Sequence, residues 1–204
     1  MKYLLATKIA MTELFDEQGN AHGTTVLKAG PVTVTQVRTK EKDGYAALQV
    51  GFDVAREKSV TKPLKGHLKR SGGLFKHLKE FPLDTEVDIK VGDTVDVSQF
   101  SLGDMVTVRG TSKGKGFQGV VKRHGFHGGR RTHGQKHSER EPGSIGASGV
   151  QRVFRGTRMA GRMGGDTVTV KNLKVLRVDA ERNELYLKGA IPGRRGTLLT
   201  IIGR

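Results

Sequence analysis

The residues from Gly114 to Gly119, GKGFQG, match the glycine spacing that cradles the phosphates of a dinucleotide. That motif works when it follows a strand and opens a helix, within a βαβ unit, and Glu139 lies about 20 residues further on, as it requires. The sequence that follows, VVKRHGFHGG, is not expected to form a helix, and no βαβ pattern surrounds it. A nucleotide- or flavin-binding β-barrel enzyme using this run as a phosphate cradle is therefore the alternative function, and the less favoured one.

Four histidines, at positions 124, 127, 133 and 137, have spacings that could suit a metal ion. No nearby carboxylate or thiol completes a ligand set, and the surrounding cations would repel a metal. We expect these side chains to donate to phosphates or to stack on bases instead. No carboxylate pair lies in an apolar setting that would tune it for acid–base work. The sequence therefore predicts no enzyme activity, no catalytic residues, no metal and no cofactor.

The same stretch, residues 112–165, dominates the charge of the chain. It carries 12 Lys and Arg against two Glu, and 14 of the 29 glycines. Glycine at this density makes ordering costly, and no apolar period repays the cost, so we expect the stretch to be mobile in water. Opposite a polyanion its cations would pair with phosphates and its glycines would allow close approach. A disordered basic linker is the alternative interpretation.

Three phenylalanines, Phe117, Phe126 and Phe154, alternate with the cations of this stretch. They could stack on unpaired bases, at about 1–3 kcal/mol per base. They could equally pack on one another or on a neighbouring protein. An irregular, glycine-rich basic arm suits folded RNA better than duplex DNA, since no basic helix or dimerising heptad is present.

The composition of the whole chain bounds the partner. The 204 residues carry a formal charge of +16 with a pI near 10.3, which indicates nucleic acid or an acidic membrane surface. No cysteine is present, and no apolar run is long enough to span a bilayer. We expect a soluble intracellular protein without a membrane partner or a small-molecule substrate.

Strand patterns flank the basic stretch on both sides. Alternating β-branched segments occur before it, for example VTVTQVRT at residues 32–39, and MVTVR leads directly into it. After it come TVTVKNLKVLRV, expected to break into two strands near Asn172, then ELYLKGAI and TLLTII. Short strands separated by turns predict a sandwich or a barrel. The basic stretch is then an insertion in a β-domain, anchored at both ends.

Between residues 55 and 85 the pattern becomes helical and basic. Pro63 suits a first helical turn that Ser71, Gly72 and Gly73 end, and Leu74, Phe75 and Leu78 suggest a second helical turn. This insert is either a solvated charged helix pair or a second RNA-contacting surface. The candidate secondary contacts are Lys62, Lys65, His67, Lys69 and Arg70.

Several long motifs resemble the universal L3 family of large-subunit ribosomal proteins, in its bacterial type. They are FSLGDMVTVRGTSKGKGFQGVVKR at 100–123, HGF at 124–126, THGQ at 132–135, PGSIGA at 142–147, RMAGRMG at 158–164, RVDAERN at 177–183 and KGAIPG at 188–193. TKPLKGHLK at 61–69 and KIAMTELFDEQGN at 8–20 extend the resemblance toward the start. It therefore covers nearly the whole chain in order.

This resemblance implies a mainly β fold, a split β-barrel of the translation-protein type with a small helical insert and a long basic extended loop. The implied organisation is barrel strands at 1–54, the insert at 55–85, barrel strands at 86–111, the RNA-penetrating loop at 112–165 and closing barrel strands at 166–204. The RNA-binding candidates are Lys113, Lys115, Lys122, Arg123, His124, Arg130, Arg131, His133, Lys136, His137, Arg140, Arg152, Arg155, Arg158 and Arg162.

The function implied by the resemblance is structural. The family is a constituent of the large ribosomal subunit that binds its 23S-type RNA, nucleates subunit assembly and sends its loop towards the peptidyl-transferase centre. Its partners would be that RNA and neighbouring large-subunit proteins. The expected location is the cytoplasmic ribosome, with an organellar ribosome left open.

Overall fold

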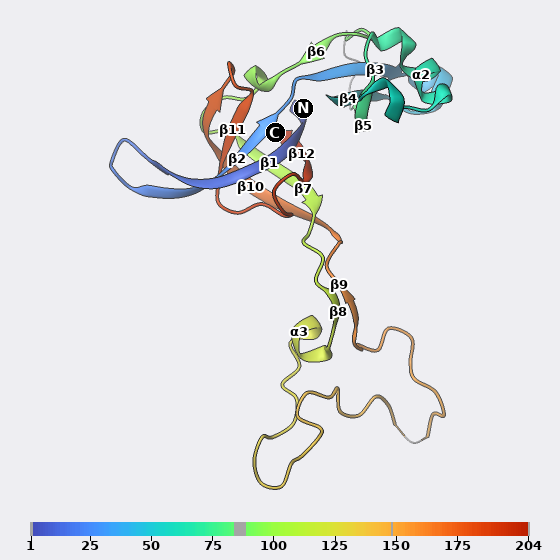
Figure 1. Ribbon diagram of the computed structural model, residues 1–204, viewed down its shortest axis with the longest axis vertical. Helices are drawn as coiled ribbons and strands as arrows, with labels where there is room; N and C mark the ends of the chain where they lie inside the picture. Colours follow the sequence, from blue (N-terminus) through green and yellow to red (C-terminus); the bar gives the residue numbers. More distant parts are fainter. Residues whose placement is uncertain (1, 84–88, 148, 204) are drawn as a thin grey trace. The chain divides into compact units, whose positions relative to one another are not determined.

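The chain forms two compact units in a computed structural model that describes residues 2–83, 89–147 and 149–203 (Figure 1). The first, called the barrel unit here, contains the chain up to Thr111 and again from Thr167. The second, called the loop unit, runs from Ser112 to Asp166. The chain thus leaves the barrel unit once and returns to it.

Six antiparallel strands close into a barrel in the order β1-β12-β7-β10-β11-β2. Their bounds are β1 (Lys2–Phe15), β2 (Ala21–Ala29), β7 (Met105–Thr111), β10 (Thr167–Asp179), β11 (Glu184–Lys188) and β12 (Leu198–Gly203). Closure follows because β1 pairs with β12 along one edge and with β2 along the other. A closed sheet has no unpaired edge, and the predicted mainly β barrel is confirmed.

Alternation of apolar residues explains the barrel's interior. Leu185 and Leu187 on β11, and Leu199 and Ile201 on β12, are completely buried. Successive side chains of a strand point to opposite faces, so residues two apart share the interior. The predicted break near Asn172 is wrong, since β10 continues past it through a bulge at which Asn172 has φ 58°. A bulge absorbs an extra residue without ending the strand.

A second sheet packs against the barrel, in the order β5-β4-β3-β6. Its strands are β3 (Val32–Arg38), β4 (Ala47–Val54), β5 (Phe75–Pro82) and β6 (Thr94–Val95), with the short helix α1 (Lys40–Asp43) between β3 and β4. Its Val50 and Phe81 join the same hydrophobic core as Leu5 of β1, and Phe81 stacks on Tyr3 with ring centroids 4.8 Å apart.

This second sheet corrects the assignment of residues 1–54 and 86–111 to the barrel. β1, β2 and β7 are barrel strands, but β3, β4 and β6 are not. The chain changes sheet after Gly30 and Pro31, and a proline cannot donate the hydrogen bond that would continue a ladder. Residues 84–88 of the predicted segments lie outside the described residues.

The basic insert is helical only in its first half. It contains η1 (Glu57–Ser59), α2 (Lys62–Leu68) and η2 (Lys69–Ser71), and Gly72 ends it in the left-handed region at φ 72°. The predicted second helical turn at Leu74, Phe75 and Leu78 is wrong, because Phe75–Pro82 is β5, paired with β4. Phe75 and Phe81 are buried at even spacing, which is a strand period. Another short helix of this unit is η3 (Val97–Gln99).

Candidate nucleic-acid interface

The loop unit begins and ends in a two-stranded stem. β8 (Gly116–Gln118) pairs with β9 (Gly161–Met163), and the ladder is extended by backbone hydrogen bonds from Lys115 N to Met163 O at 2.9 Å and from Ser112 N to Asp166 O at 2.8 Å. The glycine run from Gly114 to Gly119 is therefore one limb of this stem. The run does lead into a helix, because its last residue, Gly119, is the N-cap of the short helix α3 (Val120–His124). Its strand β8, however, is paired antiparallel with β9 and is not part of a βαβ unit, so the run differs from the open turn that holds a dinucleotide phosphate.

Some glycines of the loop unit are needed for close contact between its own limbs. Gly164 has φ 76°, and a Cβ there would collide with the carbonyl of Lys113. A Cβ on Gly128 would collide with the carbonyl of Glu139, whereas one on Gly114 or Gly146 would meet no atom within 4 Å. The glycines therefore fall into two groups. Some allow the two limbs of the loop to approach each other closely, and others leave the backbone accessible from outside the loop.

A short helix follows the stem, contrary to the expectation that VVKRHGFHGG excludes one. α3 (Val120–His124) buries Val120 and ends at Gly125, which has φ 73°. Its last turn carries Lys122, Arg123 and His124, a position where positive charge is favourable. Glycine and valine are poor helix formers, but tertiary burial of one valine and a glycine cap are enough for one turn.

Three of the predicted RNA-binding residues hold the loop together. Arg123 donates from Nη1 to the carbonyl of Met159 at 2.7 Å, and the ring Nε2 of His124 lies 3.0 Å from the same oxygen. Arg131 pairs with Glu139 at 2.6 Å. These contacts join the helix to the returning limb and cross the outer part of the loop, so these side chains are partly occupied before any ligand arrives.

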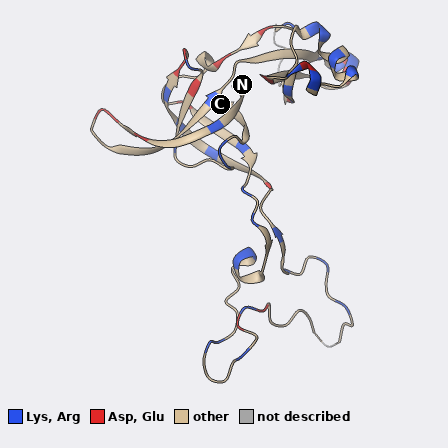
Figure 2. Ribbon diagram, in the orientation of Figure 1, with Lys and Arg blue, Asp and Glu red and all other residues tan. Residues whose placement is uncertain are grey.

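The side chains of the other predicted RNA-binding residues have no hydrogen-bond or ion-pair partner in the part of the loop that the structure describes, and they are exposed. This group comprises Lys113, Lys115, Lys122, Arg130, His133, Lys136, His137, Arg140, Arg152, Arg155, Arg158 and Arg162. Figure 2 marks the Lys and Arg positions along the chain in blue. Cations brought together without acids repel one another, and an external polyanion would relieve that repulsion.

The three aromatic candidates differ in exposure. Phe117 is 77% exposed and Phe154 is 56% exposed, so both rings present a face to solvent. Phe126 is half-buried and lies beside His124, with ring centroids 5.9 Å apart. Among the described residues no ring contact joins the three phenylalanines to one another, which leaves base stacking or a neighbouring protein as their possible roles.

A hollow of about 630 Å³ lies in the outer loop, lined by His124, Phe126, Gln135 and Arg158 among others. Two rings, an amide and a guanidinium are groups that can stack on a base or bind its polar edge. The sequence pointed to three of these residues but gave no sign that they would line one hollow, because they are separated by glycine-rich chain.

The secondary cluster on the insert is less available than its composition suggests. Lys65 pairs with Glu57 at 2.9 Å, and His67 lies 2.7 Å from Oε1 of Gln49, which also accepts from the hydroxyl of Thr35. Lys62, Lys69 and Arg70 have no such partner among the described residues. His67 is therefore part of the second sheet's polar network, and three of the five candidates remain open to a ligand.

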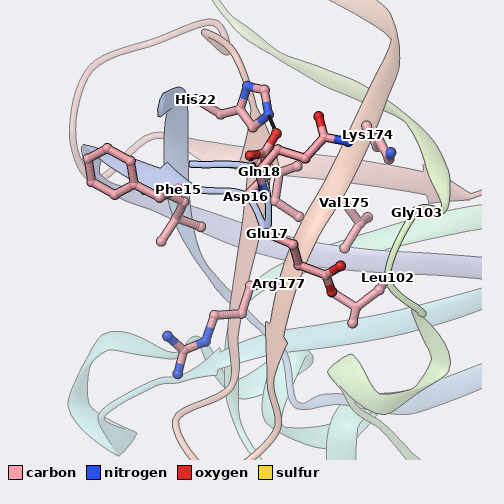
Figure 3. A pocket seen from close by; sticks show the side chains of 12 residues that line it. Phe15, Asp16, Glu17, Gln18, His22, Leu102, Gly103, Lys174, Val175 and Arg177 are labelled. Atoms are coloured by element: carbon pink, nitrogen blue, oxygen red, sulfur yellow. Dashed lines mark hydrogen bonds and ion pairs between the residues drawn. The ribbon is translucent and has the colours of Figure 1, made fainter. Parts of the chain in front are cut away.

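A second hollow, of about 790 Å³, lies between the β1–β2 hairpin and β10 (Figure 3). Phe15 and Leu102 border it together with Asp16, Lys174 and Arg177, so its charge is mixed. Asp16 accepts from the backbone N–H groups of Asn20 and Gln18 at 2.8 and 3.0 Å. The hydrogen bond from Asn20 is the main reason that the pKa of Asp16 lies below its usual value.

That hollow was missed by the sequence analysis, in which residues 16–20 appear only as part of the motif at residues 8–20. The lowered pKa of Asp16 makes it a poor proton donor near neutral pH, and its oxygens are engaged in building the turn. Among the described residues, no group of three His, Cys, Asp or Glu could hold a metal ion. Within the same residues, no helix is both long and apolar enough to cross a membrane.

Comparison with known proteins agrees with the resemblance. Residues 67–185 match the model of the family described as ribosomal protein L3. The large ribosomal subunit protein uL3 of Herpetosiphon aurantiacus is 49% identical over 97% of this chain and 94% of its own. The protein of the same name from Heliobacterium modesticaldum is 52% identical over 97% of this chain and 95% of its own. The chain belongs to the ribosomal protein L3 family.

Proposed function

We propose that this protein binds large-subunit ribosomal RNA through its loop unit and is placed by that contact in the large subunit. Membership of the family makes the chain a structural component of the ribosome and not an enzyme. The proposal adds the RNA as the direct partner and the loop as the main contact.

The exposed, unpaired cations of the loop unit carry this proposal. Residues 112–165 contain 12 Lys and Arg and two Glu. In the part of this segment that the structure describes, the one ion pair is between Arg131 and Glu139. Each cation that neutralises a phosphate releases a counterion, so binding should strengthen with their number and weaken with salt. The exposed rings of Phe117 and Phe154 add sites for unpaired bases.

The attachment of the loop supports a role in subunit assembly. Its limbs leave the barrel at Thr111 and Thr167, which are directly paired between β7 and β10. A loop held at two neighbouring points and stiffened by a stem loses less entropy on binding than a free tail. We propose that its ordering accompanies folding of the RNA, that it reaches towards the peptidyl-transferase centre, and that neighbouring large-subunit proteins contact the rest of the chain.

The location we propose is the cytoplasmic ribosome. The relatives that match across nearly their full length are bacterial and are named large ribosomal subunit proteins. This assignment is checked by separating the two ribosomal subunits of a cell extract by sedimentation. We expect the full chain to sediment with the large subunits.

The RNA contact is tested by measuring the dissociation constant for isolated large-subunit RNA at several salt concentrations, between about 50 and 200 mM. A variant with Arg152, Arg155 and Arg158 changed to Gln should bind more weakly and show a smaller salt slope. The control changes Lys40, Lys42 and Lys58, which are exposed and lie outside the loop. Equal slopes for the two variants, or a wild-type affinity independent of salt, would refute the proposal.

The same preparation separates the other interpretations. A nucleotide or flavin bound at about one equivalent would favour the phosphate-cradle enzyme. A DNA-compacting protein would bind duplex DNA as strongly as folded ribosomal RNA at moderate salt. We expect no bound nucleotide, and a clear preference for the RNA in direct competition.

A further inference from the structure

One corner of the barrel unit brings together cations that the sequence separates. Arg109 on β7 lies directly opposite Thr200 of β12 on one side and Thr169 of β10 on the other. Its neighbours Val108 and Gly110 are buried, so the exposed Arg109 side chain is on the outer face of the barrel. Its Nε donates to the hydroxyl of Thr169 at 3.3 Å.

A lysine from the second sheet completes this corner. Lys79 of β5 donates from Nζ to the hydroxyl of Thr200 at 2.7 Å, and Thr200 is only 4% exposed. Lys79 is half-buried, and burial is the main cause that lowers its pKa, with the positive charge of Arg109 as the second. The two cations are thus close enough for Arg109 to disfavour the charge on Lys79, which water screens less than it would on an open surface.

Neither cation has a carboxylate partner in the described ranges 2–83, 89–147 and 149–203. The contrast within the same unit is clear, since Lys2, Arg38 and Lys76 each form an ion pair at 2.9 Å or less. Lys79 is a partly buried charge without a counter-charge, which is unfavourable, and the exposed Arg109 adds a second positive charge at the same corner, so the corner favours an anion from outside.

Hydrogen-bonding capacity at the corner also remains unused. An ammonium has three N–H donors and a guanidinium has five. Lys79 uses one on Thr200 and Arg109 uses its Nε–H on Thr169, which leaves both Nη groups of Arg109 for a bidentate contact. The two threonine hydroxyls accept from these cations and can each donate their own hydrogen onward.

We propose that Lys79, Arg109, Thr169 and Thr200 form a phosphate-binding site on the barrel, occupied by a backbone phosphate of the RNA. The assignment to RNA rests on the proposed function. It is supported by the chain's connectivity, because the Arg109–Thr169 pair is two residues from Thr111 and Thr167, where both limbs of the loop leave the barrel. Phosphate has the charge and the acceptor oxygens that this set of donors lacks.

The salt dependence of RNA binding tests the site in the full-length chain. The double variant Lys79→Met, Arg109→Gln removes both charges; Met is similar in length to Lys, and Gln keeps the first part of the Arg stem and a polar end. The matched control, Lys40→Gln with Lys42→Gln, removes two exposed charges of α1 in the same unit. We expect the first variant to lose roughly tenfold in affinity and about one unit of salt slope, as for one phosphate contact, and the control to lose neither.

A second measurement does not depend on RNA. The Arg109 Nε–H resonance is followed by NMR while inorganic phosphate replaces chloride at constant ionic strength. A saturable shift in the wild type that Lys79→Met weakens would support the site, and no shift would overturn it. The thermal unfolding midpoint of each variant is measured as a control. A midpoint equal to that of the wild type shows that the barrel has remained folded.

The two measurements separate the possible failures. If wild-type protein does not bind RNA, the proposed function fails, and the phosphate titration alone decides whether the corner is an anion site. If phosphate binds at Arg109 but the salt slope of RNA binding equals that of the control variant, the site takes free phosphate and the assignment to RNA is wrong.

Discussion

The barrel unit and the loop unit balance their charges in opposite ways. In the barrel unit Lys2, Arg38, Lys65 and Lys76 each have a carboxylate partner, and a shared core runs through the barrel and the second sheet. In the described loop, Val120 is the one fully buried hydrophobic side chain, and Arg131 forms the one ion pair. The first unit supplies its own stabilisation, whereas the second has donors and charges that await a partner.

The Lys79–Arg109 corner lies in the barrel unit but has the electrostatics of the loop. The proposed RNA contacts therefore follow local charge balance and not only the division of the chain into two units.

Removing the outer loop, about residues 122–160, should separate the two units most clearly. Gln118 and Gly161 are paired in the stem, so the remaining chain can close through a short turn. We expect an unchanged barrel by circular dichroism and thermal unfolding, with RNA affinity lower by roughly a hundredfold or more, because many phosphate contacts are lost. Normal incorporation of the shortened chain into large subunits would contradict the proposed role of the loop.

Truncating one buried side chain in each unit should affect stability very differently. Leu185→Ala empties a fully buried position of the barrel and should lower the free energy of unfolding by about 2–5 kcal/mol. Val120→Ala in α3 should leave the barrel's unfolding transition within roughly 0.5 kcal/mol, since Val120 belongs to the loop unit and not to the unit that contains the barrel. Chemical denaturation measures both, and similar losses would mean that the two units unfold together.

Glycine-to-alanine substitutions should also affect stability differently in the two units, with a smaller change in the free energy of unfolding than Leu185→Ala. A Cβ on Gly110 would collide with the buried side chain of Leu199, so Gly110→Ala should destabilise the barrel by about 1–3 kcal/mol. A Cβ on Gly146 would meet no atom within 4 Å, and Gly146→Ala is the matched loop control. Denaturation midpoints compare the two, and equal midpoints would show that the collision is relieved at little cost.

The smallest expected effect concerns pH and the carboxylate of Asp104. Its hydrogen bond from Lys2, and then the backbone N–H of Ser101, lower its pKa below the usual 3.8. Because the pKa of Asp104 is lower in the folded protein than in the unfolded chain, the ionised carboxylate stabilises the fold above about pH 4. This stabilisation is lost as the pH falls through the pKa of the folded protein. Asp104→Asn should therefore flatten the decrease in unfolding midpoint between about pH 4 and pH 2.

A loop substitution provides the comparison for that pH series. Glu139 pairs with Arg131 inside the loop unit, so Glu139→Gln should leave the unfolding midpoint of the barrel unit unchanged at every pH tested. A flattened curve for this variant as well would show that the loop contributes to the acid stability of the whole chain.

The sequence was most informative where a pattern is local. The alternation in TLLTII and ELYLKGAI predicted β12 and β11, and Pro63 with Gly72 marked the two ends of the helical insert. The charge of residues 112–165 and its position between strand patterns predicted an insertion in a β-domain, and β7 precedes this segment while β10 follows it.

The errors came from contacts distant in the sequence. β5 was taken for a helical turn because its pairing with β4 is not visible in FKHLKEFP by itself. α3 was excluded because local propensity ignored the burial of Val120. His67 contacts Gln49, which lies on β4 and is 18 residues away in the sequence. The basic residues around His67 therefore suggested a free RNA-binding side chain, although its ring already has a partner.

What the sequence by itself determined is the inventory: strand-forming segments, a cation-rich glycine loop, and motifs that identify the family. Charge and periodicity are carried by neighbouring residues, so they can be recognised before the chain folds. Only the tertiary structure decided which strands close the barrel, which cations keep carboxylate partners, and that Lys79 meets Arg109 and Thr200. Those outcomes depend on strand register and sheet packing, which join residues far apart along the chain.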